Sequence, residues 1–221
     1  IPTNPSLFQS LNLQQNIQHN FGDILDYDSL INVFEKFKPE IVFHLAAQPI
    51  VSESIKNPID TYRTNIIGSA NVLECIRNSK SVKTAVMITS DKCYENVEWE
   101  YGYREIDALG GKDPYSASKA GAEIIFSSYF RSFLNNNNKL GICTARAGNV
   151  IGGGDWAIDR IVPDTIKSWT NDSPAILRNP RSTRPWQHVL EPLSGYLLLA
   201  YQLNKNNSFI NGTSFNFGPS S

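Results

Sequence analysis

Residues 84–92 read TAVMITSDK: six apolar or β-branched residues, followed at once by a polar turn. Such a run, without polar alternation, is typical of a strand buried on both faces of a parallel sheet. Two similar runs and three segments with helical spacing complete the pattern: Ile41–Leu45, Leu140–Ala145, Tyr27–Phe37, Ile59–Asn78 and Tyr115–Leu134. This alternation of strand and helix predicts an α/β fold, a doubly wound parallel sheet with helices on both faces.

Local signals mark the ends of several elements. Asn57-Pro58 and Asp113-Pro114 each place a polar capping residue before a proline in the first helical turn, where a missing N–H costs nothing. The tract Asn135–Asn138 predicts a surface loop, and Pro192–Leu203 predicts a further helix. These signals support the pattern read from the apolar runs.

A glycine-rich turn, the usual start of a dinucleotide-binding fold, is not found before the first clear strand. The cluster Gly152–Gly154 comes late, and the Asp155 that follows it is unsuited to cradling phosphate. Since the opening strand of such a fold lies mid-sheet, its loss would leave unpaired edges in the core. We therefore expect part of a longer chain, with residues 1–150 as a domain incomplete at its N-terminus and residues 151–221 as part of a smaller substrate-binding region.

The composition is that of an ordinary globular protein and excludes several partners. The 221 residues carry 20 basic and 21 acidic side chains, a formal net charge of −1, so no basic field is present to hold a nucleic acid. No apolar run reaches the roughly 18 residues of a membrane span, and no signal-peptide pattern is evident. Three cysteines without pair spacing predict free thiols and a cytoplasmic location. The three histidines lack ligand spacing, so we expect no metal.

Two residues on the third predicted helix are suited to acid–base chemistry. Tyr115 and Lys119 are four residues apart and so share one helix face. A nearby ammonium favours the phenolate, and the helix dipole adds to this effect, so we expect the pKa of Tyr115 to fall below its usual value of about 10. Tyr201 and Lys205 have the same spacing, however, and nothing around them suggests chemistry. The spacing alone is therefore weak evidence.

Polar residues follow the predicted strands at the edge where ligands bind in open parallel sheets. Ser90 is placed to hydrogen-bond a substrate hydroxyl and Asp91 to act as a general acid; the alternative is an ordinary strand-end turn. The small residues of Leu45–Gln48 allow close approach of a flat cofactor, or they simply pack a helix on a strand. Asp23, after a short strand expected near Asn16–His19, either accepts from an adenine amino group or caps the next helix.

Several of these motifs occur in the order found in the extended short-chain dehydrogenases, a Rossmann-like family. They are His44–Gln48, Asn65, Thr89–Tyr94 and Tyr115–Lys119. Three stretches more specifically resemble the CDP-glucose 4,6-dehydratases within that family: Ser90–Tyr94, Arg146–Trp156 and Arg184–Val189. The resemblance runs from about Gly22 to Gly218, nearly the whole chain, and its long motifs are far more specific than a Tyr-x-x-x-Lys pair.

The resemblance implies a reaction with tightly bound NAD that turns CDP-glucose into a 4-keto-6-deoxy sugar nucleotide. Tyr115, supported by Lys119 and Ser90, would oxidise the sugar at C4; water would then leave across C5 and C6, and hydride would return to C6. Asp91 would protonate the departing C6 hydroxyl. Lys92 stands where dTDP-glucose relatives carry the glutamate taken as the C5 base, so it belongs to the site with its role open. The alternatives are an epimerase or reductase on the same scaffold, and a non-catalytic sugar-nucleotide-binding protein.

The resemblance also implies binding residues and a partner. Cofactor contacts are expected from Asp23, Ile24, Leu45, Ala46, Ala47, Gln48, Tyr115 and Lys119, and substrate contacts from Asn149, Arg160, Arg184 and His188. Arginines suit a pyrophosphate because the guanidinium fork matches its oxygens; for Arg160, an ion pair with a neighbour such as Asp159 is the competing interpretation. Asn65 is expected to be structural. The helices Ile59–Asn78 and Tyr115–Leu134 correspond to those through which family members form homodimers.

Overall fold

The structure is a computed structural model and describes residues 3–205 and 208–219. Within them, the main sheet has four parallel strands in the order β1-β2-β3-β6. Their bounds are β1 (Ile41–His44), β2 (Thr84–Ile88), β3 (Gly141–Ala147) and β6 (Ser214–Phe217). A short parallel pair, β4 (Val150–Ile151) and β5 (Gln187–His188), lies apart from it. The α/β class and the parallel sheet predicted from the sequence are confirmed.

The helices follow the predicted segments closely. They are α1 (Leu7–Ser10), α2 (Tyr27–Phe37), α3 (Val51–Lys56), α4 (Pro58–Tyr62), α5 (Gly68–Asn78), α6 (Pro114–Tyr129), α7 (Ile161–Thr170) and α8 (Leu190–Asn204). Two 3₁₀ turns and two π-helical turns add η1 (Leu13–Gln15), η3 (Asp91–Cys93), η2 (Arg63–Ile67) and η4 (Phe130–Leu134). The single helix predicted over Ile59–Asn78 is α4 and α5 joined through η2, and the helix predicted to end at Leu134 ends in η4.

Two local predictions are wrong. The strand expected near Asn16–His19 is absent from the described structure: η1 precedes it, and residues 18–23 run as irregular chain. An isolated strand is unfavourable because its backbone N–H and C=O groups have no ladder to join. Asn57 precedes Pro58 as predicted but makes no side-chain cap, because its amide donates to Glu53 instead.

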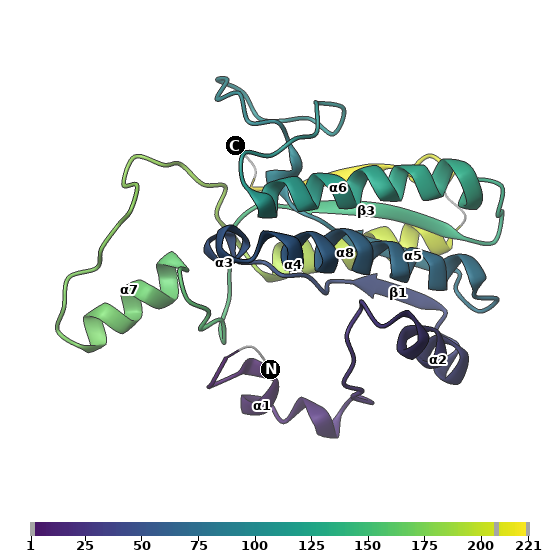
Figure 1. The fold of residues 1–221 in the computed structure, drawn as a ribbon, viewed down its shortest axis with the longest axis horizontal. Helices are drawn as coiled ribbons and strands as arrows, with labels where there is room; N and C mark the ends of the chain where they lie inside the picture. Colours follow the sequence, from purple (N-terminus) through teal and green to yellow (C-terminus); the bar gives the residue numbers. More distant parts are fainter. Residues whose placement is uncertain (1–2, 206–207, 220–221) are drawn as a thin grey trace.

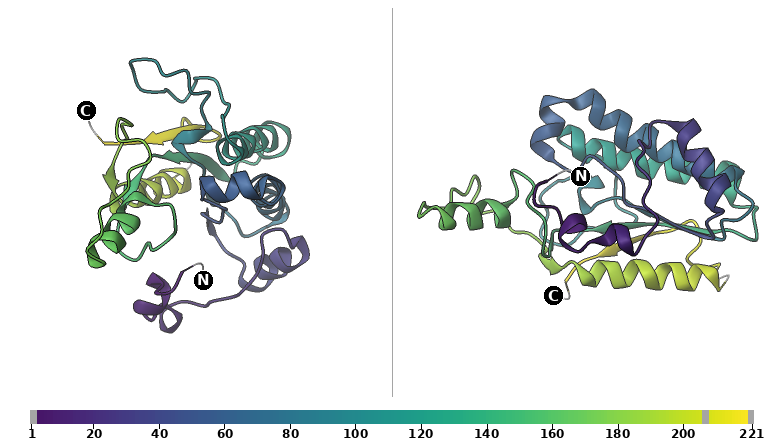
Figure 2. Two further views of the ribbon diagram at one scale, coloured as in Figure 1. Left: turned by 60° about the vertical axis from the view of Figure 1, so that its left-hand side comes forward. Right: turned by 90° about the horizontal axis from the view of Figure 1, so that it is seen from below.

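Helices cover both faces of the sheet (Figure 2), which explains the unalternating apolar runs. Ala85 and Met87 of β2 face the helical layer that contains α2, α5 and α6. Val86, between them, faces α8, where it packs with Tyr196 and Leu203. Side chains alternate along a strand, so every position of such a strand contributes to one core or the other.

The segment between β4 and β5, called the arm below, carries α7 and leaves the sheet beyond the carboxyl ends of the strands (Figure 1). α8 and β6 follow this arm in the sequence yet return to the main sheet, where α8 packs on β2 and β3 and β6 pairs with β3. The region between the strand ends and the arm is therefore bounded by segments from many parts of the chain. Within the described residues, no helix combines the length and apolar character needed to cross a bilayer.

Candidate active site

Ser90 and Asp91 lie where the chain leaves β2. The Ser90 hydroxyl caps η3, accepting the Lys92 N–H at 3.2 Å and donating to Asp91 Oδ1 at 3.0 Å. The Lys92 ammonium lies 3.6 Å from the same carboxylate oxygen. This is the ordinary strand-end turn that the sequence allowed, but it also orients Asp91. The Asp91 Oδ2 atom faces Gly148: a Cβ added to Gly148 would stand 3.4 Å from it.

The first turn of α6 is fixed from two sides. Asp113 caps it as predicted, accepting the Ser116 N–H at 3.0 Å and the Ser116 hydroxyl at 2.6 Å, and Pro114 takes the first position. The Tyr115 N–H, which has no carbonyl of its own helix to bond, donates to Ser54 Oγ of α3 at 3.1 Å. The Tyr115 side chain thus projects from an anchored backbone and is 8% exposed.

The structure brings the Tyr115 hydroxyl near Ser90 and near the charges of Asp91 and Arg160. Burial raises the pKa of Tyr115 because the phenolate would lose its hydration; Ser90 and Arg160 act in the opposite direction, and Asp91 raises the pKa further. The prediction that the pKa falls below about 10 is therefore wrong for this arrangement. Desolvation of the phenolate outweighs the favourable neighbours.

Lys119 lies one turn along α6 from Tyr115 and is 6% exposed. Its ammonium donates to Ile88 O, at the end of β2, over 3.5 Å. Burial lowers the pKa of Lys119 from 10.5 to about 8, while the Glu123 carboxylate acts to raise it. The amine is therefore mostly protonated at neutral pH, and two of its three N–H groups have no acceptor among the described residues.

The loop after β1 forms the neighbouring part of this edge. Leu45 and Ala46 are exposed and Ala47 is half-buried, so a ledge of mainly small side chains faces outward. Gln48 is held from behind, because Asn65 Oδ1 accepts the Gln48 N–H at 2.8 Å and Asn65 Nδ2 donates to Gln48 O at 3.0 Å. Asn65 also donates to Ser118 Oγ at 2.8 Å and so ties this loop to α6. Its place is the structural one expected.

Asp23 and Ile24 precede α2. Asp23 is exposed, and its Oδ1 accepts the Leu25 N–H at 2.9 Å. The cap of α2 is Asp26, not Asp23, so that alternative for Asp23 is wrong. Ile24 packs on α5 at Gly68, where a Cβ would stand 2.5 Å from Ile24 Cδ1. The second carboxylate oxygen of Asp23 thus faces solvent beside an anchored apolar side chain.

Asn149 and Arg160 carry buried polar atoms that lack partners within the described residues: Asn149 Oδ1 and Arg160 Nε. Arg160 Nη2 makes a long contact of 3.4 Å with Pro49 O. The competing interpretation, a pair between Arg160 and Asp159, is wrong, because Asp159 pairs with Arg178 at 3.3 Å. Buried polar groups are nearly always hydrogen-bonded, so these two atoms call for partners such as water or a polar ligand.

Arg184 and His188 are exposed, and the structure does not join their side chains to this cluster. Arg184 Nη1 donates to the adjacent Thr183 O at 2.7 Å, and His188 Nδ1 accepts the Leu190 N–H at 3.2 Å. The backbone of this segment does approach the site: a Cβ on Gly148 would stand 2.6 Å from Pro185 Cγ. The segment therefore borders the site, with these two side chains turned to local contacts.

A buried ion pair beneath the site is not predicted from the sequence. Glu123 on α6 and Arg146 on β3 lie 2.8 Å apart and are 2% and 4% exposed. Thr89, the residue before Ser90, donates to the same carboxylate. A signal exists in the sequence, since Glu123 continues the four-residue series of Tyr115 and Lys119 along an otherwise small and apolar helix face.

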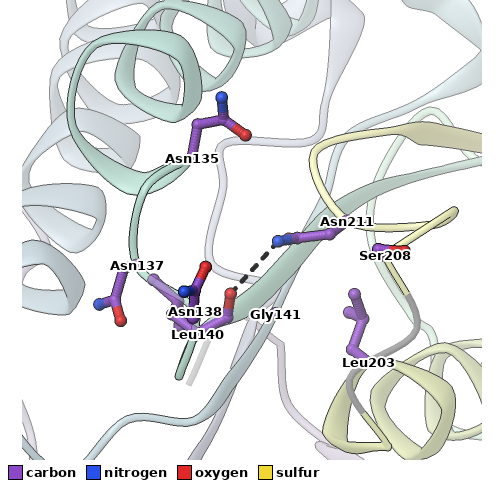
Figure 3. A pocket seen from close by; sticks show the side chains of 8 residues that line it. All are labelled: Asn135, Asn137, Asn138, Leu140, Gly141, Leu203, Ser208 and Asn211. Carbon is purple, nitrogen blue, oxygen red and sulfur yellow. Dashed lines mark hydrogen bonds between the residues drawn. The ribbon is translucent and has the colours of Figure 1, made fainter.

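Two hollows lie outside the cluster around Tyr115. One, of about 250 Å³, is at the start of β3, the end of that strand opposite the site (Figure 3). Its lining contains no acid or base and consists of Asn135, Asn137, Asn138, Leu140, Gly141, Leu203, Ser208 and Asn211. Asn211 donates to Leu140 O across it at 3.3 Å. The other, of about 430 Å³, lies between the N-terminal segment and Gly154. Neither supplies acid–base chemistry at the β2 edge.

The fold and this constellation define the chain's class: a Rossmann-type protein of the short-chain dehydrogenase kind, with its site at the carboxyl edge of the sheet. The family model for GDP-mannose 4,6 dehydratase matches residues 5–218, and the chain belongs to this family.

Two relatives of known activity are similar over most of the chain. The CDP-glucose 4,6-dehydratase of Salmonella typhimurium is 50% identical over 223 residues, which cover 99% of this chain and 62% of that enzyme. The dTDP-D-glucose 4,6-dehydratase of Dictyostelium discoideum is 31% identical over 205 residues, or 88% of this chain and 46% of that one. The chain thus spans about half to two thirds of the length of these relatives.

Solved structures share the fold. A UDP-glucuronic acid 4-epimerase from Bacillus cereus, solved with UDP-glucuronic acid and NAD, superposes with a TM-score of 0.80 at 25% identity, covering 97% of this chain and 64% of that one. A dTDP-glucose 4,6-dehydratase from Bacillus anthracis, solved with NAD, gives 0.78 at 22% identity, covering 97% and 63%. Among the residues described, no three His, Cys, Asp or Glu side chains gather as a metal site would require.

Proposed function

We propose that the protein is an NAD-dependent lyase, a sugar-nucleotide 4,6-dehydratase that converts CDP-glucose to CDP-4-keto-6-deoxyglucose. The observation that carries the proposal is the buried Tyr115 side chain, which lies near Ser90 and Asp91 and one turn from Lys119. The choice of CDP-glucose is supported by the 50% identity to the Salmonella enzyme.

The residues present fit part of an NAD molecule. The two unbonded N–H groups of the Lys119 ammonium, with the Tyr115 hydroxyl, suit the nicotinamide ribose, and the open ledge of Leu45, Ala46, Ala47 and Gln48 suits a flat ring. Asp23 has an exposed carboxylate oxygen for the adenine amino group, beside the anchored Ile24. Bound there, NAD would supply the acceptor for the C4 hydride and the donor for its return to C6, with a solvent proton completing C5.

Tyr115 and Ser90 serve the oxidation at C4. The Tyr115 oxygen receives the proton of the C4 hydroxyl. Ser90 forms a hydrogen bond to the C4 oxygen. Tyr115 accepts that proton as its phenolate, and the Arg160 charge and the nearby Ser90 favour this form because both act to lower the pKa of Tyr115 against the effect of burial. Lys119 adds a positive charge one turn away.

Asp91 serves the elimination. Once C4 is a ketone, the C5 proton is acidic: the Asp91 carboxylate takes it and passes it to the C6 hydroxyl, which leaves as water while the C5–C6 double bond forms. Lys92 lies 3.6 Å from Asp91 Oδ1 and Ser90 donates to the same oxygen, so we assign Lys92 to orienting Asp91. That assignment gives Lys92 a role other than that of the C5 base.

The sugar nucleotide is assigned to the orphan atoms of Asn149 and Arg160, which need polar partners. A guanidinium fork at Arg160, with Arg184 turned inward from its local contact, suits the diphosphate, and His188 is a weaker candidate on the same segment. In this proposal residues 1–150 hold the cofactor and residues 151–221 contribute to the substrate region.

We also propose a cytoplasmic homodimer. Ile67, Ile124 and Phe133, on the helices expected to pair, are 51%, 57% and 55% exposed, a large apolar surface to leave in water. The cysteines of the chain are buried and unbonded, which agrees with a reducing compartment. Light scattering of the purified protein that shows monomer alone would contradict the dimer.

The test is to supply CDP-glucose and NAD without external reductant and to follow the product by mass spectrometry. A product lighter by one water supports the dehydratase. An isomer of unchanged mass supports an epimerase, the activity of the Bacillus cereus neighbour. Binding of CDP-glucose without any turnover supports the non-catalytic alternative.

A further inference from the structure

Glu123 continues the catalytic face of α6 into the protein interior. Tyr115, Lys119 and Glu123 follow one another at intervals of four residues, so they stack on one side of the helix, roughly 6 Å apart along its axis. Exposure changes little along this line, from 8% at Tyr115 through 6% at Lys119 to 2% at Glu123. A carboxylate therefore lies one turn beneath the amine that serves the proposed reaction.

The Glu123 carboxylate bonds to the strands on which the rest of the site is built. Thr89, at the end of β2, donates to Oε1. Oε2 accepts from Thr144 at 3.0 Å, from Arg146 at 2.8 Å and from Ser214 at 3.1 Å. Since Ser90 directly follows Thr89, one carboxylate joins the helix of Tyr115 and Lys119 to the strand end of Ser90 and Asp91.

Hydrophobic residues of similar volume would fill this space without the desolvation that a buried ion pair costs. A charge kept there at such a cost calls for a role beyond packing. We propose that Glu123 is a positioning residue, which places a negative charge one turn beneath the Lys119 amine and holds α6 in register with the end of β2. Its effect on turnover rests on the function proposed above.

The groups around Lys119 single out Glu123 as the relevant charge. Burial lowers the pKa of Lys119 to about 8, and the groups that raise it are Glu123 and Cys93. Burial raises the pKa of Cys93 to about 12, so this thiol carries no charge near neutral pH. From β1, burial and then the Lys119 charge lower the pKa of His44 to about 4, so the imidazole is neutral as well. Glu123 is thus the anion that opposes the loss of the Lys119 proton, and Arg146, its ion-pair partner, acts in the opposite direction.

The test is an NMR titration of the full chain carrying ¹³C-labelled lysine, with the Lys119 signal assigned through Lys119→Arg. Glu123→Gln keeps the side-chain shape and removes the charge, and the Lys119 pKa is expected to fall by about one unit. Thr144→Val is the matched control, because it removes a hydrogen bond to the same carboxylate and keeps the charge. It should leave the Lys119 titration in place.

Turnover gives the second readout: the alkaline limb of the pH profile should move down with the Lys119 titration in Glu123→Gln and stay in place in Thr144→Val. Should Glu123→Gln fail to fold, the double variant Glu123→Gln/Arg146→Gln removes the pair without leaving a lone charge, and it should show a smaller fall because the opposing Arg146 charge is lost as well. An unchanged Lys119 titration, or an equal shift in Thr144→Val, overturns the proposal. The titration needs no substrate, so an inactive wild type would count against the dehydratase and not against Glu123.

Discussion

The chain carries the same Tyr-x-x-x-Lys spacing on two helices, with opposite outcomes. On α6, Tyr115 lies in the first turn, is 8% exposed, and has Ser90 and Asp91 nearby. On α8, Tyr201 is 54% exposed, and Lys205, just past the helix end, places its ammonium 4.3 Å from the Tyr201 ring centroid. The first pair is turned into the sheet edge, and the second forms a cation–π contact on the surface.

The difference lies in what each helix turns toward the sheet. α8 packs on the sheet through residues such as Leu199, Ala200 and Leu203, so Tyr201 faces out. α6 faces the strand ends with the very side that carries Tyr115 and Lys119. A four-residue spacing places two side chains on one helix face. Whether they lose their hydration and meet other polar groups depends on what that face packs against.

The largest expected effect compares Tyr115→Phe with Tyr201→Phe. Removing the hydroxyl of Tyr115 removes the group proposed to take the C4 proton, so turnover of CDP-glucose should fall by about 10²–10⁴-fold. Tyr201→Phe should leave turnover unchanged. Product formation measured by mass spectrometry decides, with CDP-glucose affinity as the control for folding. Equal activity of the two variants would contradict the assignment of different roles to Tyr115 and Tyr201.

Lys119 and Lys205 should also differ in their contribution to the free energy of unfolding of the protein. Because the folded-state pKa of Lys119, about 8, lies below its usual 10.5, the unfolded chain binds more protons between these values. Lys119 therefore opposes folding below pH 8, and this cost disappears as the pH rises to the unfolded value. Lys119→Met should raise the free energy of unfolding by about 2–3 kcal/mol at pH 7 and by little near pH 10.5.

The matched variant on α8 is Lys205→Met, whose effect should stay within about 0.5 kcal/mol at both pH values, as for most surface changes. Urea unfolding measures both lysine variants. A gain for Lys119→Met that does not depend on pH would show that packing, rather than the buried charge, separates the two lysines.

A smaller effect is expected at Ser90. Ser90→Ala removes the hydrogen bond to Asp91 and the hydroxyl near Tyr115, so turnover should fall by roughly tenfold to a hundredfold, or about 1.4–2.7 kcal/mol. The pKa of Tyr115 should rise further, moving the acidic limb of the pH profile to higher pH. A profile that keeps its shape while KM alone rises would assign Ser90 to substrate binding instead.

Most of the fold follows from local patterns in the sequence. The apolar runs predict β1, β2 and β3 to within two residues at either end, and α2 lies over the predicted residues. The prediction of a strand near Asn16–His19 is wrong because a strand needs a hydrogen-bonding partner strand, which the local sequence does not specify.

The candidate site is likewise only partly predictable from the sequence. Motifs place Tyr115, Ser90 and Asp91, but burial reverses the predicted pKa direction of Tyr115, and burial is a property of the assembled fold. Pairings over long sequence separations are also invisible to local pattern: Asp159 takes Arg178 rather than its neighbour Arg160, and Glu123 takes Arg146 from another element.

The most direct test of the central claim is a crystal structure of the protein with NAD and CDP-glucose, using Tyr115→Phe to hold unreacted substrate and the wild type with product. We predict that the glucose C4 oxygen lies at the ring edge of residue 115 and hydrogen-bonds Ser90, with Asp91 at C6 and Asn149 and Arg160 on the nucleotide. A glucose whose C4 lies away from this edge, with Asp91 remote from C6, would contradict the account.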